Sequence, residues 1–214
     1  MGIKVAVMIW KSLVRSILEY GCEIWGDCSL PNFERLQIQM GRKLLRCGSR
    51  TNNEVVRGEL GWGTLKSRRD ELRLRYWRRL VVMSEDRIPR IVYEQSRQRL
   101  EIELKNGGLQ TATWCKYTKE LMEELKLDEY WEANKALDEE QWKKLVKSRI
   151  HEREEKTWLG KINEKPKLRT YVKLKHKLEQ EQYLLVRDRR GVPELTKLRS
   201  GTSRLRIEKG DTKT

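Results

Sequence analysis

The sequence predicts an all-α protein, a multi-helix bundle followed by an extended, partly flexible basic helical tail. Apolar residues return at intervals of three and four along most of the chain, the spacing that places them on one face of a helix. Capping residues precede several of these runs, and Gly or Pro follows them. No run alternates with period two for long enough to indicate a sheet, and no repeat of fixed length is present.

The first two predicted helices each carry an apolar stripe that ends near a glycine. The first stripe consists of Ile3, Val7, Trp10, Val14 and Ile17, and Gly21 is a natural stop. The second follows a Ser-Leu-Pro-Asn entry and consists of Phe33, Leu36, Met40, Leu44 and Cys47, with Gly48 as its stop.

Capping residues mark the start of the next two predicted helices. Thr51 and Glu54 have capping-box spacing and open a short helix that ends near Gly61. Thr64 can cap the following helix. Its inner stripe is Leu65, Leu72, Tyr76, Leu80 and Met83, and a second apolar strip is Leu74, Trp77 and Val81.

Further helical patterns follow Pro89, Trp114, Asp138 and Pro166, and the Asn106-Gly107-Gly108 break is the best candidate for a boundary. We therefore predict three segments. These are a helical bundle over 1–106, an acidic helical segment over 107–160 and a basic tail over 161–214.

Charge is distributed unevenly among the 214 residues, whose formal net charge is +15. Residues 161–214 contain 16 Lys and Arg against 7 Asp and Glu, and residues 61–110 contain 12 against 7. Residues 111–160 are acidic, with 10 against 12. Such an imbalance favours a polyanionic partner, and nucleic acid over a membrane surface, because we identify no Lys- or Arg-faced helix with a broad, bulky apolar face. A solvated surface without a specific partner would give the same charge count.

Catalytic and metal-binding patterns are weak throughout the sequence. The four cysteines are spaced C-x5-C-x18-C-x67-C, which matches no zinc template. His151 and Glu155 form H-E-x-x-E, which lacks the second histidine of a zinc protease and is better explained as an exposed helical pair. No two aspartates are adjacent. The sequence therefore predicts no enzyme, no cofactor, no metal site and no small-molecule substrate.

Neither a secretory signal peptide nor a membrane span is visible, since only six uncharged residues separate Lys4 from Lys11. The expectation is an intracellular protein of the nucleus or cytoplasm.

An arginine ridge is the strongest candidate binding feature. In SRRDELRLRYWRRL (67–80), four arginines fall within an arc of about 100° on a helix, and they are Arg68, Arg75, Arg78 and Arg79. Arginines on a rigid helix can form bidentate hydrogen bonds with successive phosphates. Glu71 can neutralise part of this ridge through a pair with Arg75. The interleaved Tyr76 and Trp77 have the spacing of core residues rather than of a base-stacking platform.

Four stretches resemble the carboxy-terminal region of reverse transcriptases from non-LTR (LINE-type) retrotransposons. They are WKSLVRSILEYGCEIWG (10–26), GELGWGTLKSRRDELRLRYWRRLV (58–81), KLRTYVKLKHKLEQEQYLL (167–185) and LTKLRSGTSRLRIEKG (195–210). In this family the last stretch leads to a Cys/His-rich zinc knuckle. Here no cysteine or histidine follows His176.

The resemblance implies RNA-directed DNA polymerase as the parent activity, with thumb-like helices in 1–106 and a post-thumb tail in 161–214. A polymerase thumb holds the template and primer by shape and charge. The palm aspartates of the family are absent from this sequence, so the resemblance implies a non-catalytic remnant or fragment that binds RNA, DNA or hybrid backbones.

Two functions remain open from the sequence. The first is a nucleic-acid-binding module whose contacts are the ridge and a basic tail, represented by Lys173, Lys177, Arg187, Arg189 and Arg190. The second is a helical protein-interaction module without nucleic-acid function, in which the acidic residues 111–160 meet a basic partner or fold back on the basic flanks of the same chain. The oligomeric state is not predicted.

Overall fold

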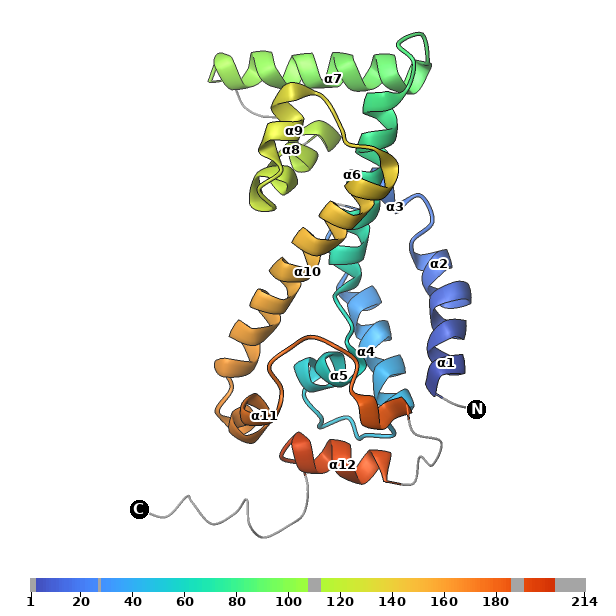
Figure 1. The fold of residues 1–214 in the computed structure, drawn as a ribbon, viewed down its shortest axis with the longest axis vertical. Helices are drawn as coiled ribbons and strands as arrows, with labels where there is room; N and C mark the ends of the chain where they lie inside the picture. Colours follow the sequence, from blue (N-terminus) through green and yellow to red (C-terminus); the bar gives the residue numbers. More distant parts are fainter. Residues whose placement is uncertain (1–2, 27, 108–112, 186–190, 203–214) are drawn as a thin grey trace. The chain divides into compact units, whose positions relative to one another are not determined.

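The computed structural model describes residues 3–26, 28–107, 113–185 and 191–202 (Figure 1). Over these residues the chain is all-α and 75% helical, and no strand is formed. One isolated antiparallel bridge joins Leu60 and Gln180. The predicted fold class is therefore confirmed. No helix within the described part of the chain combines the length and the hydropathy that a bilayer span requires.

The chain divides into two compact units that are not consecutive in sequence. Unit 1 comprises Met1–Leu18, Leu30–Leu65 and Glu154–Thr214, and unit 2 comprises Glu19–Ser29 and Lys66–Arg153. These boundaries differ from those of the three segments predicted from composition.

Unit 1 begins with a continuous helical stretch formed by α1 (Ile3–Ile9), a π-helical turn (Trp10–Val14) and α2 (Arg15–Leu18). Of the predicted stripe, Ile3 and Trp10 are buried, but Ile17 is 76% exposed. The extra residue of a π turn rotates the following side chains by about 100° relative to an α-helix. This rotation explains why Ile17 leaves the buried face.

The centre of unit 1 is formed by α4 (Pro31–Leu45) and α5 (Asn53–Leu60). The cap of α4 is Arg46 at φ 51°, which precedes the predicted stop at Gly48. The side chain that caps α5 is Asn52, which accepts a hydrogen bond from the Glu54 amide at 2.9 Å, so the predicted cap at Thr51 is one residue too early.

The carboxy-terminal part of unit 1 consists of short helices that follow the end of α10 (Glu139–Asn163). They are the 3-10 helix Pro166–Leu168, α11 (Arg169–Leu174), the 3-10 helix Gln182–Leu185 and α12 (Val192–Arg199). Two apolar clusters form its core. The first includes Ile3, Trp10, Ile38, Leu184 and Val192, and the second is Val55, Trp158, Ile162, Leu168, Tyr171 and Leu178. The described parts of the predicted tail are therefore packed elements of a folded unit.

Unit 2 contains α3 (Cys22–Trp25), α6 (Leu65–Val82), α7 (Ile88–Lys105), α8 (Trp114–Glu124), α9 (Asp128–Ala133) and the first part of α10. Its core is rich in tryptophan. Trp77 lies with its ring centroid 5.1 Å from that of Trp142 and 6.5 Å from that of Trp131. The Trp142 indole N–H donates to the Leu74 carbonyl at 3.0 Å.

The buried face of α6 agrees only in part with the predicted inner stripe. Leu65 and Leu80 of that stripe are buried as predicted, but Leu72 and Tyr76 are half-buried. Leu74 and Trp77 of the second strip are fully buried. Leu74 and Trp77, which were predicted to form a second apolar strip, therefore lie at the centre of the core of unit 2. The cause is the set of aromatic partners from α9 and α10, which pack on Trp77.

Candidate nucleic-acid interface

Two of the four ridge arginines are engaged within unit 2. One guanidinium nitrogen of Arg68 lies 2.7 Å from the Glu71 carboxylate, and its Nε lies 3.4 Å from that of Glu19. Burial lowers the pKa of Arg68, but the carboxylates of Glu71 and Glu19 outweigh it and raise the pKa overall. Arg78 donates through Nε to the Leu137 carbonyl at 3.0 Å.

The remaining ridge arginines are more accessible. Arg79 is exposed, and its guanidinium lies 5.5 Å from the centroid of the Tyr76 ring. Arg75 is 37% exposed and lies 4.0 Å from the Glu71 carboxylate. Trp77 is buried, as its spacing predicted, and Tyr76 packs edge-on against Trp114. The ridge thus offers two accessible guanidinium groups, Arg75 and Arg79, rather than a continuous row of four.

Of the five predicted binding residues in the tail, the structure describes two. Lys173 and Lys177 are exposed on unit 1, whereas Arg187, Arg189 and Arg190 lie outside the described residues. Lys173 and Lys177 belong to a longer basic segment, residues 156–178, in which eight Lys and Arg accompany a single acidic residue, Glu164. Six of the eight are exposed, and they are Lys156, Lys161, Lys167, Arg169, Lys173 and Lys177. The sequence analysis missed four of these six because it counted charge over wider windows.

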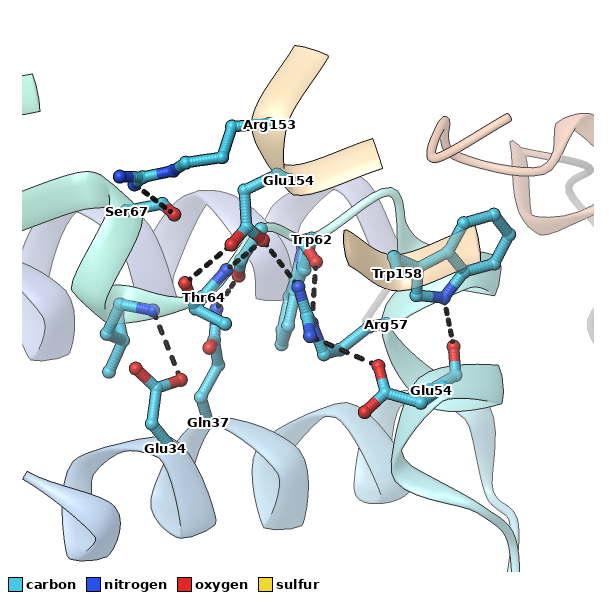
Figure 2. A network of polar contacts seen from close by, with 12 residues as sticks. Glu34, Gln37, Glu54, Arg57, Trp62, Thr64, Ser67, Arg153, Glu154 and Trp158 are labelled. Atoms are coloured by element: carbon cyan, nitrogen blue, oxygen red, sulfur yellow. Dashed lines mark hydrogen bonds and ion pairs between the residues drawn. The ribbon is translucent and has the colours of Figure 1, made fainter. Parts of the chain in front are cut away.

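Buried aromatic side chains fix the basic segment in place. Trp158 and Tyr171 have no exposed surface, and their rings pack edge-to-face with centroids 6.4 Å apart. The Trp158 indole N–H donates to the Glu54 carbonyl at 2.9 Å (Figure 2). The backbone amide of Leu178 donates to the Glu155 carboxylate at 2.8 Å. The exposed cations between these anchors are therefore carried by an ordered scaffold.

A buried polar network connects Glu154, just before this segment, with the GELGWGT motif (58–64) at the end of α5. Figure 2 shows Arg57, Glu154 and Thr64 pointing toward one another. Arg57 lies 2.5 Å from the Glu154 carboxylate and 3.1 Å from that of Glu54, and its Nε donates to the Trp62 carbonyl at 3.2 Å. Both the amide and the hydroxyl of Thr64 donate to Glu154 at 2.9 Å. Since the charged groups of Arg57 and Glu154 are satisfied by one another, by Glu54, by Thr64 and by a backbone carbonyl, this network stabilises the fold.

A second buried cluster surrounds Glu59, which has no exposed surface. Arg199 donates to Glu59 from Nε at 3.1 Å, and the Tyr183 hydroxyl donates to it at 2.5 Å. Burial raises the pKa values of Tyr171 and Tyr183 far above the usual range, and the charge of Glu59 raises them further. Both hydroxyls therefore stay protonated.

Gly61 of the GELGW motif (58–62) has a structural role. Gly61 adopts φ +62°, and a Cβ there would lie 2.4 Å from the Gln180 amide nitrogen. A left-handed backbone and a close chain crossing together require glycine. Gly61 caps α5, as expected from the prediction that this helix ends near Gly61.

Metal ligands do not gather in the described residues, where no three His, Cys, Asp or Glu side chains could hold a metal ion. His151 is exposed, and Glu155 accepts from Leu178 in place of the expected pair with His151. Comparisons with protein-family models, curated proteins and solved structures found no match for this chain.

Proposed function

We propose that this chain is a non-catalytic nucleic-acid-binding module of the retroelement RNA-directed DNA polymerase type, which holds phosphate backbones without regard to sequence. The observation that carries the proposal is the basic segment 156–178, with its eight cations against one carboxylate and six of those cations exposed. Phosphate contacts of this kind position a nucleic acid but contain no base information. The resemblance of 58–81 and 167–185 to non-LTR reverse transcriptases supports the same class of ligand.

The basic segment is a better candidate than the ridge because it exposes more cations. Lys173 and Lys177 are exposed lysines beside the buried Tyr171 and Leu178. Arg68 is held by two carboxylates, and Arg78 donates to a backbone carbonyl. Breaking these existing contacts would reduce the binding free energy gained from each new phosphate contact.

The decisive experiment compares two triple variants that remove the same number of charges. The first is Lys167→Gln, Lys173→Gln and Lys177→Gln in the basic segment. The matched control is Lys143→Gln, Lys144→Gln and Lys147→Gln, three exposed lysines of α10 in the acidic region. Affinity for duplex DNA, duplex RNA and hybrids of unrelated sequence is measured by fluorescence anisotropy over a range of salt concentrations.

The basic-segment variant should bind all three duplexes more weakly by similar factors. On duplex DNA, the slope of log affinity against log salt should flatten by about 0.9 for each lost phosphate contact. The control variant should keep the slope of the unmodified protein. Equal weakening by both variants would mean that only net charge matters and would contradict the proposal.

Polymerase activity is tested separately with primed templates and Mg²⁺ or Mn²⁺. We expect no template-dependent extension, because the sequence has no adjacent aspartates for a two-metal site. Truncation after Thr157 is not a suitable test of the tail, since it would remove the buried Trp158 and Tyr171 and unfold unit 1.

A further inference from the structure

The first helical stretch of unit 1 has apolar side chains on two faces. Ile3, Ala6 and Trp10 are buried against the unit. Apolar side chains away from that face are exposed, and they include Val5, Met8, Ile9, Leu13 and Ile17. Met8 and Leu13 are each 62% exposed. Bulky apolar side chains that recur on one exposed helix face are typical of interaction surfaces.

The π turn at Trp10–Val14 produces this second face. In an unbroken α-helix, Ile17 would follow Ile3 and Trp10 on the buried side. The extra residue of the π turn moves Leu13 and Ile17 toward solvent, and such turns are frequent at functional sites. The exposure of Ile17 is therefore a consequence of the π-helical backbone at Trp10–Val14.

A hollow of about 460 Å³ lies beside the exposed face. It is lined by Val7, Met8 and Ser12, with Lys4, Lys11 and Gln180 completing its wall. The apolar side chains of Val7 and Met8 and the cationic groups of Lys4 and Lys11 in its lining suit a ligand that combines a bulky apolar side chain with neighbouring carboxylates.

Charge restricts the partner further. Residues 1–18 contain Lys4, Lys11 and Arg15 and no Asp or Glu. From the apolar face, the hollow and this charge, we propose that the 3–18 helical stretch is a docking site for an acidic amphipathic helix of another protein. The partner helix would place apolar side chains at intervals of three and four on Met8, Leu13 and Ile17 and carry Glu or Asp on both flanks.

Two other occupants fit less well. A second copy of this chain would bring the same cationic face against itself, and like charges across an interface disfavour pairing. A membrane-inserting helix also combines a bulky apolar face with lysine and arginine. A bilayer surface would cover the exposed side chains without filling the hollow beside Met8, which a single apolar side chain of a partner helix can enter.

The test uses a fluorescein-labelled synthetic peptide of about 18 residues, long enough to form a helix, with a leucine stripe flanked by glutamates. One control peptide has the same composition in an order that destroys the stripe. Another has lysine in place of each glutamate. Binding to the full-length protein is followed by fluorescence anisotropy.

The striped acidic peptide should bind, and the two control peptides should bind at least about tenfold more weakly. Met8→Ser with Leu13→Ser should weaken the striped peptide by a similar factor. Val92→Ser with Ile102→Ser, which alters exposed apolar residues of α7, is the matched control and should not change binding. Circular dichroism confirms that both double variants remain folded.

Three results would overturn the proposal. The first is equal binding of the striped and reordered peptides. The second is self-association in analytical ultracentrifugation that the Met8→Ser, Leu13→Ser variant abolishes, which would assign the face to a second copy. The third is co-sedimentation with phosphatidylserine vesicles, lost in the same variant, without binding of the striped peptide.

Discussion

Arg199 donates to Glu59 at 3.1 Å although the two residues are 140 positions apart in sequence. Glu59 belongs to α5 and is fully buried, and Arg199 is the last residue of α12. The pair joins the GELGW motif to the carboxy-terminal part of the chain. The described tail is therefore necessary for unit 1 to complete its core.

Replacing Arg199 with Leu should lower the free energy of unfolding by about 3 to 5 kcal/mol, because it leaves the Glu59 carboxylate buried without its cation. Urea unfolding followed by tryptophan fluorescence measures the change. Arg50→Leu, at an exposed arginine of the same unit, is the control and should stay within about 0.5 kcal/mol. A loss at Arg199 no larger than that of the control would show that α12 is not anchored by this pair.

Two glycines should respond in opposite directions to alanine. A Cβ at Gly58 would lie 2.3 Å from the Tyr171 hydroxyl oxygen and 2.6 Å from an atom of the Trp158 ring, whereas Gly160 has open space around it. Gly58→Ala should cost about 1 to 3 kcal/mol through overpacking. Gly160→Ala should stabilise α10 by about 0.5 to 1 kcal/mol through helix propensity. Thermal unfolding of both variants distinguishes them, and stabilisation by Gly58→Ala would contradict the packing described for Tyr171.

Core truncation on α6 should be more severe at Leu74 than at Leu72. Leu74 is fully buried beneath Trp142, so Leu74→Ala should cost about 2 to 5 kcal/mol. Leu72 is half-buried, so Leu72→Ala should lower the free energy of unfolding by less. The free energies of unfolding of the two variants in urea provide the comparison. The reverse order would favour the inner stripe predicted from the sequence.

The cysteines should differ in reactivity at pH 8. Burial raises the pKa of Cys115 to about 12, and burial with the charges of Glu19 and Glu23 raises that of Cys22 to about 11. Cys28 is exposed. A thiol reagent should label Cys28 first, and mass spectrometry should find Cys22 and Cys115 labelled only after denaturation.

Because burial raises the pKa values of these thiols, we expect the folded protein to lose stability in alkali. A thiol has a usual pKa of 9.0, so the unfolded chain ionises first while the folded chain keeps Cys115 protonated up to about pH 12. The folded state then holds more protons, and stability falls as the pH rises from about 9 toward 12. Urea midpoints across this range test the sign. A Cys115→Ala variant should show a shallower decline.

Changing Arg75 and Arg79 to Gln should weaken nucleic-acid binding less than the three changes in the basic segment do. These two ridge arginines are more accessible than Arg68 and Arg78, and each can contribute up to about 0.9 to the salt slope on duplex DNA. Arg68→Gln should instead reduce stability, since Arg68 pairs with Glu71 and Glu19. A larger loss of affinity from Arg75 and Arg79 than from the basic segment would make the ridge the main contact surface.

Local pattern was sufficient to predict the helices but insufficient to predict their partners. Asp138 caps α10 as expected, because its carboxylate accepts from the Glu140 and Gln141 amides at 3.1 Å. The exposure of Ile17 could not be read from spacing, since the π turn interrupts the period of 3.6 residues. The burial of Leu74 depends on Trp142, which is 68 residues away. Contacts at such separations have no signature in a single sequence.

The candidate interface was predicted in part. Lys173 and Lys177 are exposed as expected. The basic segment around them was missed because charge was counted over wider windows. Its placement depends on Trp158, Ile162, Leu168 and Tyr171, which belong to one apolar cluster in the structure. The internal pairing of Arg68 with Glu19 was missed because Glu19 lies 49 residues before Arg68.

The interleaved order of the two units has a consequence for synthesis on the ribosome. Most of unit 2 is one uninterrupted stretch, residues 66–153, and it can fold as soon as that stretch emerges. Unit 1 cannot, because residues 1–65 precede this stretch and their partners Trp158, Tyr171 and Arg199 follow it. Folding of the intervening residues shortens the loop that unit 1 must close and reduces the entropy lost in closing it. We expect the helices of residues 1–18 and 30–65 to be synthesised before residues 66–153 but to reach their final packing after them.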